Sequence, residues 1–167
     1  MNLMQLLKRC EVFVGLSDDD LQKIADLPSW REISYDIGDF IFHENDTAHN
    51  FYILEEGEIS LIVALNGTEL KSIKQTPVDT ITKGDVFGWS SLVSPHSLTM
   101  SATCIKPSTV LAVDGVELSQ LFDRDAALGY EVMKGLVRVI GARLRDIRRT
   151  FVGKENFPFL KNRNGLE

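Results

Sequence analysis

Hydrophobic residues change their spacing twice along the chain, and these changes divide it into three zones. In the first zone the apolar residues recur at helical spacing: Leu3, Leu6, Leu7 and Cys10. Ser17 then precedes three aspartates and a second apolar run. A serine cap followed by acids favours a helix start, because it satisfies free N–H groups and suits the helix dipole. With Pro28 as a stop, residues 1–28 are predicted to form N-terminal helices.

The second zone, residues 30–113, contains short runs of aromatic and β-branched residues, which favour strands. The clearest runs are 40–42, 51–54, 59–63 and 109–113. Turn residues separate them, and Asn66-Gly67 predicts a hairpin between 59–65 and 69–73. Regular short strands with frequent turns predict a barrel or a sandwich.

The third zone, residues 114–151, returns to helical spacing. Asp114 predicts the cap of a short helix that ends at Phe122, and a second helix is expected from about Asp125. Apolar residues of this second helix alternate at intervals of three and four, which is a heptad pattern. We call this set the heptad stripe: Ala126, Tyr130, Met133, Val137, Ile140, Leu144, Ile147 and Phe151.

The same helix carries a second stripe, which consists of Leu128, Val132, Leu136 and Val139. Two stripes are difficult to bury in a domain this small, so one is expected to pack on the strands and the other on something else. The heptad stripe therefore predicts a homodimer through the C-terminal helix, and packing within one chain is the alternative. Gly135 and Gly141, inside the helix, predict a close approach of another helix. The expected dimer residues are Tyr130, Met133, Val137, Ile140, Leu144 and Ile147.

The length of 167 residues fits one domain, residues 1–151. Residues 152–167 lack periodicity and predict a flexible tail, whose last two residues look tag-derived. Composition is globular, with 44% hydrophobic and 25% charged residues, and no apolar run approaches a membrane span. The net charge of -6 argues against nucleic-acid binding. Basic residues nevertheless cluster from Lys134 to Arg163, as a solvated surface or as a contact for an acidic partner.

Candidate catalytic chemistry is sparse. Cys10 and Cys104 predict free thiols in a reducing cytoplasm, and the N-terminus lacks the basic segment of a secretory signal. A cytoplasmic protein is therefore expected. His43, His49 and His96 do not have the close spacing of a metal site, and no nucleophile or phosphate-binding motif is visible. The sequence predicts neither an enzyme nor a metal protein.

Three blocks in the strand zone resemble the cyclic-nucleotide-binding domain family, as in catabolite-activator-like bacterial regulators and the regulatory subunits of cyclic-nucleotide-dependent kinases. The blocks are residues 37–42, 51–59 and 83–88, and the resemblance covers about residues 5–151. It implies a mainly β fold with flanking helices: a double-stranded β-helix or jelly-roll-like β-roll, N-terminal helices and a long C-terminal helix. Too few residues follow Phe151 for a winged helix-turn-helix, so a stand-alone bacterial-type member without a DNA-binding domain is expected.

Turn residues of these blocks fit the resemblance. Gly38 and Gly57 would occupy tight turns, where a positive φ is often needed. Asn45 stands where the family usually has glycine, and asparagine is the best substitute for a left-handed turn. The departure at this position is therefore mild.

The resemblance also implies a ligand cassette, in which a glutamate accepts the ribose hydroxyl and an arginine neutralises the cyclic phosphate. Here Trp89 stands at the glutamate position and Leu98 at the arginine position. No Arg or Lys lies between Lys83 and Lys106. Loss of both contacts corresponds to about 4 kcal/mol, or about a thousandfold in affinity. Cyclic AMP or cyclic GMP is therefore not expected to bind in the family's usual way.

Candidate ligand-binding residues are those of the cassette: Phe87, Gly88, Trp89, Ser90, Ser91, Leu98, Thr99 and Ser101. Ser90 and Ser91 offer backbone donors and hydroxyls, whereas Trp89 either fills the pocket, stacks on a flat ligand or contacts solvent or a partner.

Two functions remain open. The first is a non-enzymatic sensor, in which a cyclic nucleotide or another small nucleotide-like ligand moves the C-terminal helix and acts through an unknown protein partner. The second is a constitutive dimeric scaffold with a filled cassette. An accessible cavity beside Trp89 favours the sensor, and an occluded one favours the scaffold.

Overall fold

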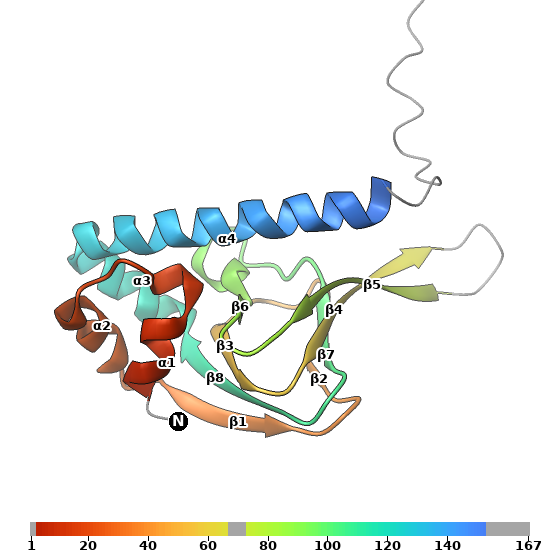
Figure 1. Ribbon diagram of the computed structural model, residues 1–167, viewed down its shortest axis with the longest axis horizontal. Helices are drawn as coiled ribbons and strands as arrows, with labels where there is room; N and C mark the ends of the chain where they lie inside the picture. Colours follow the sequence, from red (N-terminus) through yellow and green to blue (C-terminus); the bar gives the residue numbers. More distant parts are fainter. Residues whose placement is uncertain (1–2, 67–72, 153–167) are drawn as a thin grey trace, which may run out of the picture.

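The computed structural model describes residues 3–66 and 73–152 and places helices around one end and one side of a β-roll (Figure 1). The N-terminal helices are α1 (Leu3–Arg9), the 3-10 helix η1 (Glu11–Phe13) and α2 (Asp18–Ala25). The strands are β1 (Arg31–Tyr35), β2 (Phe40–Phe42), β3 (Asn50–Glu56), β4 (Ile59–Asn66), β5 (Ile73–Ile81), β6 (Val86–Phe87), β7 (Ser101–Cys104) and β8 (Ser108–Asp114). The remaining helices are η2 (Trp89–Leu92, 3-10), α3 (Gly115–Arg124) and α4 (Ala126–Val152).

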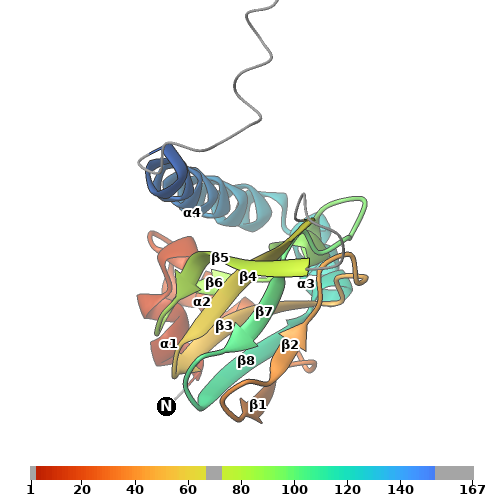
Figure 2. The ribbon, with the colours of Figure 1, turned by 90° about the vertical axis from the view of Figure 1, so that its right-hand side faces the viewer.

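The roll consists of two four-stranded antiparallel sheets, with strand orders β1-β8-β3-β6 and β2-β7-β4-β5. Figure 2 shows these strands wrapping around a common interior, with α4 along one side. This arrangement is the β-roll with flanking helices that the sequence resemblance implies, so the predicted fold class is confirmed.

Two predicted helix caps are confirmed. The Ser17 hydroxyl accepts the Asp20 N–H at 3.1 Å, and the Asp114 carboxylate accepts the Glu117 N–H at 2.9 Å. The helix after Asp114 continues to Arg124, slightly beyond the predicted end. Asp125 then accepts the Leu128 N–H at 3.1 Å, which places the start of α4 where the sequence predicts it.

The predicted hairpin after β4 is present, because Asn66 pairs with Ile73 and β4 pairs with β5 along its length. Strand β5 runs on to Ile81, beyond the predicted end at residue 73. Residues 67–72 lie outside the described part of the chain, and with them the predicted turn at Gly67 and residues 69–72 of the predicted strand. Pro77 argues against a strand in the sequence, yet β5 is an edge strand and Pro77 lies at a register shift, where proline is tolerated.

The central strands β3 and β8 of the sheet β1-β8-β3-β6 are buried on both faces. Phe51 and Ile53 of β3 pack into the cluster that contains the helices, whereas Tyr52 and Leu54 pack into the cluster inside the roll. Strand β8 alternates in the same way. This explains why 51–54 and 109–113 are continuous apolar runs rather than alternating ones.

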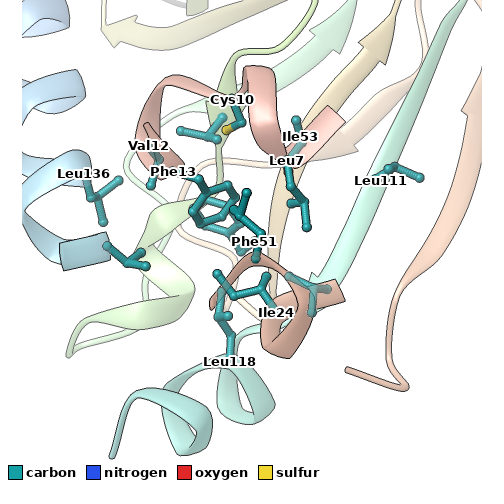
Figure 3. Close-up of a cluster of buried hydrophobic side chains, with 14 of the residues drawn as sticks. Leu7, Cys10, Val12, Phe13, Ile24, Phe51, Ile53, Leu111, Leu118 and Leu136 are labelled. Atoms are coloured by element: carbon teal, nitrogen blue, oxygen red, sulfur yellow. The ribbon is translucent and has the colours of Figure 1, made fainter. Parts of the chain in front are cut away.

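Figure 3 shows how the helices close over this sheet, with Phe13, Ile24 and Leu118 gathered around Phe51. The second stripe of α4 belongs to the same cluster, since all four of its residues are buried: Leu128, Val132, Leu136 and Val139. Cys10 is also buried there, and its burial raises the pKa of the thiol to about 12. One of the two stripes therefore packs on the chain's own core.

The heptad stripe lies mostly on the opposite side of α4. Tyr130, Val137 and Leu144 are 65%, 68% and 66% exposed, whereas Met133 and Ile140 are half-buried at the edge of the core. Lys134 Nζ lies 4.7 Å from the centroid of the Tyr130 ring, and the three side chains otherwise remain largely exposed in the described chain. The side chain of Phe151 lies outside the described residues.

Turn positions agree with the resemblance: φ is 90° at Gly38, 100° at Gly57 and 70° at Asn45. Of the predicted tail, residues 153–167 lie outside the described part of the chain, and the two residues that look tag-derived are among them. No helix in the described ranges is both long and apolar enough to span a bilayer.

Gly135 packs directly on η1 and constrains the placement of α4. A Cβ there would lie 2.0 Å from the Val12 carbonyl oxygen, so no larger residue fits without a backbone shift. At Gly141 the nearest atom to such a Cβ is the Arg145 Nη1, at 3.6 Å, which is an ordinary contact. The predicted close approach is therefore observed with η1 at Gly135, whereas no described part of the chain approaches Gly141 closely.

The two glycines give a matched test. Gly135→Ala is expected to lower the free energy of unfolding by about 1–3 kcal/mol through overpacking. Gly141→Ala should raise it by up to about 1 kcal/mol, because alanine is the better helix former. Urea denaturation followed by circular dichroism measures both. Equal effects of the two substitutions would contradict the assigned contact with η1.

Candidate ligand-binding site

The cassette begins where β6 ends against β3. Gly88 follows with φ of 72°, and a Cβ there would lie 2.7 Å from the Tyr52 ring and 2.9 Å from the Asn50 carbonyl oxygen. Only glycine fits this position, because the conformation is left-handed and the space is already filled. Gly88 thus turns the chain into η2 and directs Trp89 toward α4.

A cavity of about 170 Å³ lies between the cassette and α4. The roll contributes side chains from β2, β4, β5 and β6, and α4 closes the other side with Ile140, Arg143, Leu144 and Ile147. Figure 1 shows α4 passing along this side of the roll, with the labels of β5 and β6 beneath it. Asp79 and Arg143 are the only charged residues in the cavity wall, among the residues that the structure describes.

Six of the eight sequence-predicted cassette residues meet in this wall: Phe87, Gly88, Trp89, Ser90, Leu98 and Thr99. Ser91 does not line it. Its backbone N–H donates to the Gly88 carbonyl oxygen at 3.1 Å, and its side chain packs where a Cβ on Gly115 would be. Ser101 also lies outside the wall, since its hydroxyl accepts the Glu44 N–H at 2.9 Å.

Leu98, at the position where the resemblance expects arginine, is 6% exposed. Its N–H donates to the Asp46 carbonyl oxygen at 2.9 Å, and its carbonyl oxygen accepts the Asn45 N–H at 2.7 Å. These bonds hold the loop before β7 against the turn after β2. Leu98 therefore forms an apolar wall between the ligand cavity and that turn.

Arg143 is the principal residue of the site that the sequence reasoning missed. Its side chain is 13% exposed, and its guanidinium carbon lies 4.9 Å from the centroid of the Trp89 ring, which is a cation–π distance. Its Nε lies 3.6 Å from the Asp79 Oδ2. The sequence contained an indication that Arg143 faces the core. The second stripe ends at Val139, and one further interval of four residues reaches Arg143.

Asp79 comes from the edge strand β5, directly opposite Leu61 of β4. Its Oδ1 accepts the Thr80 N–H at 2.9 Å. Its Oδ2 is buried without a hydrogen-bond partner, and so is the Nη1 of Arg143. The two charges are thus close, but their hydrogen-bonding capacity is only partly used.

Burial dominates the electrostatics of this pair. It raises the pKa of Asp79 above its usual value, with the charge of Arg143 opposing that rise. It also lowers the pKa of Arg143, against the carboxylates of Asp79, Asp85 and Glu11. Both shifts have the sign expected when a charged form is withdrawn from water.

An apolar cavity between a short cassette helix and a long C-terminal helix, with two convergent polar groups, has the features of a small-molecule-binding site. The chain belongs to the cyclic nucleotide-binding domain family, whose model matches residues 32–125. Recognition of this family from the three sequence blocks is therefore confirmed.

Similar proteins include a cyclic nucleotide-binding protein of Geobacter metallireducens, whose crystal structure shares 30% sequence identity at a TM-score of 0.72. That match covers 86% of this chain and 99% of the other. The cGMP-dependent protein kinase, isozyme 1, of Drosophila melanogaster is 26% identical over 75% of this chain, which spans 15% of the kinase.

A fold neighbour of lower identity is the regulatory subunit of a cAMP-independent protein kinase A from Trypanosoma cruzi, solved with bound guanosine. It is 18% identical at a TM-score of 0.65, over 81% of this chain and 43% of the other. At this identity the likeness concerns the fold.

The Asp79–Arg143 pair predicts a specific pattern of stability. Arg143→Met leaves a partly buried carboxylate unpaired and Asp79→Asn leaves a buried cation unpaired, so each should cost about 1–3 kcal/mol. The double variant should cost at least about 1 kcal/mol less than the sum of the two. Urea denaturation of the four proteins measures this coupling, and strict additivity would contradict it.

A pH series gives the sign of the Asp79 contribution. Because burial raises the pKa of Asp79, the ionised carboxyl destabilises the folded state, and this penalty disappears as pH falls through the raised pKa. The deficit of Arg143→Met relative to the parent protein should therefore shrink from pH 7 toward acid. A deficit that is constant with pH would show that Asp79 is not the affected group.

Proposed function

We propose that this chain is a regulatory module that binds a small nucleotide-like ligand in the cavity between the cassette and α4 and responds through α4. The observation that carries the proposal is the cavity of about 170 Å³ beside Trp89. An accessible space at this place is what a sensor requires, whereas a scaffold with a filled cassette would leave none.

The wall of the cavity supports a flat ligand. Most of its side chains are apolar, and Trp89 contributes an aromatic ring. Trp89 also connects the cassette to the helix, because Arg143 of α4 lies over its ring. A ligand beside Trp89 therefore meets both the roll and α4.

Cyclic AMP or cyclic GMP is a doubtful ligand for this cavity. Trp89 replaces the expected glutamate, and Leu98 places an apolar side chain where the phosphate-binding arginine is expected. The Trypanosoma cruzi neighbour bound to guanosine indicates that this fold can hold a nucleoside that carries no phosphate. We infer that a nucleotide-like ligand without the usual phosphate contact suits this chain better.

The response is proposed to pass through a homodimer. Tyr130, Val137 and Leu144 recur every seven residues along α4 and are each about two-thirds exposed. Leu144 also lies at the rim of the cavity, next to Arg143. A partner helix on the heptad stripe would thus contact the same turns of α4 that border the ligand.

Ligand binding is tested by a thermal-shift titration with cyclic AMP, cyclic GMP, their nucleosides and a small metabolite panel, since a ligand of the folded state raises the melting temperature. Thr99 lines the cavity and is exposed, so Thr99→Trp should fill the space and abolish the shift. Val93→Trp adds the same bulk to an exposed residue outside the wall and should retain it.

Three outcomes of this titration distinguish a sensor from a scaffold. A shift that Thr99→Trp removes supports the sensor. A shift with a cyclic nucleotide at low micromolar concentration contradicts the inference drawn from Trp89 and Leu98. Silence across the whole panel favours the alternative, a constitutive dimeric scaffold that acts on protein partners.

Dimerisation is tested by sedimentation equilibrium. The parent protein is expected to sediment as a dimer, and Val137→Glu as a monomer, because it buries a charge in the centre of the helix pair. Val116 of α3 is 64% exposed and offers a matched control, so Val116→Glu should remain dimeric. A monomeric parent protein would contradict the proposed interface.

A further inference from the structure

The cavity contains a buried donor and a buried acceptor that the protein itself leaves without hydrogen-bond partners. The donor is Nη1 of Arg143 on α4, and the acceptor is Oδ2 of Asp79 on β5. Buried polar atoms without partners are rare in folded proteins and each costs free energy. Two such atoms of opposite type, on facing elements of one cavity, indicate a ligand that supplies one acceptor and one donor.

The positions of the two groups are fixed independently of any ligand. Asp79 is held by the Thr80 N–H at 2.9 Å, and Arg143 is held by the Trp89 ring at 4.9 Å. Nε of Arg143 lies 3.6 Å from Oδ2 of Asp79, and Nη1 belongs to the same guanidinium, so both unused atoms lie in the same part of the cavity wall. A ligand that carries an acceptor and a donor on one edge can therefore meet both.

The charge of the wall selects against an anion. One cation and one carboxylate line the cavity among the described residues, so the formal charge of the pair is zero. The nearby carboxylates of Asp85 and Glu11 add to the negative field at Arg143. A phosphate group placed beside Arg143 would be repelled by these carboxylates in a poorly solvated space. An uncharged ligand would not be repelled in this way.

The size and shape of the cavity limit which ligand it can hold. Its volume of about 170 Å³ is smaller than that of pockets for drug-sized ligands, which is about 300–1,000 Å³. It suits one flat ring system, and the apolar wall favours its faces. A heterocycle with a ring N–H beside a carbonyl has this shape and presents the required donor and acceptor on adjacent atoms.

We propose that the cavity binds an uncharged nucleobase or nucleoside through a lactam edge, with its carbonyl oxygen accepting from Arg143 Nη1 and its ring N–H donating to Asp79 Oδ2. This inference rests on the proposed function, because it names the ligand class of the same cavity. It assigns recognition to a helix residue and an edge-strand residue outside the predicted cassette.

The proposal is tested by isothermal titration of the full chain with guanosine, 1-methylguanosine and cyclic GMP. Guanosine should bind at least tenfold more tightly than cyclic GMP, because it lacks the phosphate. It should also bind at least tenfold more tightly than 1-methylguanosine, in which the ring N–H is blocked. These comparisons use the unaltered protein and do not depend on the folding of any variant.

Two substitutions then separate the roles of the charges. Arg143→Met should weaken guanosine binding at least tenfold. Asp79→Asn should weaken guanosine binding but strengthen cyclic GMP binding, because it gives the cavity a net positive charge. Exposed residues of the same types supply the controls, and Arg138→Met and Asp123→Asn should change neither affinity by more than about twofold.

The outcomes distinguish failure of the lactam-edge contact from failure of the proposed ligand-binding function. If guanosine and 1-methylguanosine bind equally, or cyclic GMP binds more tightly than guanosine, the lactam edge is wrong while the binding function stands. If no nucleoside and no cyclic nucleotide binds, both the ligand class and the proposed function are overturned. An unchanged preference for guanosine in Asp79→Asn would overturn the assigned role of Asp79.

Discussion

The structure depends on two central strands, β3 and β8, that are buried on both faces of their sheet. In β3 the side chains of Phe51 and Ile53 join the helices, while those of Tyr52 and Leu54 fill the roll. Since successive strand residues point to opposite faces, the register of β3 fixes both cores at once. The helices are therefore an integral layer of the fold, and α4 joins this layer through η1 and α3, which pack in the same cluster as β3.

This shared sheet explains how a cavity forms beside Trp89. Strand β6 pairs with β3 and leads directly into η2, so the cassette is held at the margin of the doubly buried sheet. The second stripe holds the first half of α4 in the helical cluster that covers the other face of that sheet. The cavity wall is then completed by the part of α4 that continues beyond the second stripe, where Arg143 faces Trp89 and Asp79.

The sequence predicted the fold where local signals and burial agree. The caps at Ser17 and Asp114, the left-handed Asn45 and the buried second stripe all follow from short-range patterns. Strand β5 could not be predicted in the same way, because its edge position, which tolerates Pro77, is set by pairing with β4. Tertiary pairing decides such cases over local propensity.

The candidate site was predictable only in part, for a similar reason. Six cassette residues lie in the cavity wall as expected, since they follow one another closely in the chain. Arg143 and Asp79 meet only through the folding of α4 against β5, and a charged residue at the end of an apolar stripe resembles an ordinary surface position. Ser91 appeared available in the sequence, but its N–H is taken by the turn of η2 itself.

The glycine contact at η1 divides α4 mechanically. Gly135 meets the backbone of Val12, so the helix has a nearly rigid point of attachment there. From this point to Val152 the helix extends for roughly 25 Å, at about 1.5 Å per residue. Around this fulcrum a tilt of about 5° would displace the last turn by about 2 Å. A displacement of about 1 Å at Arg143 would thus reach the far end of the helix as about 2 Å, with the helix serving as a lever.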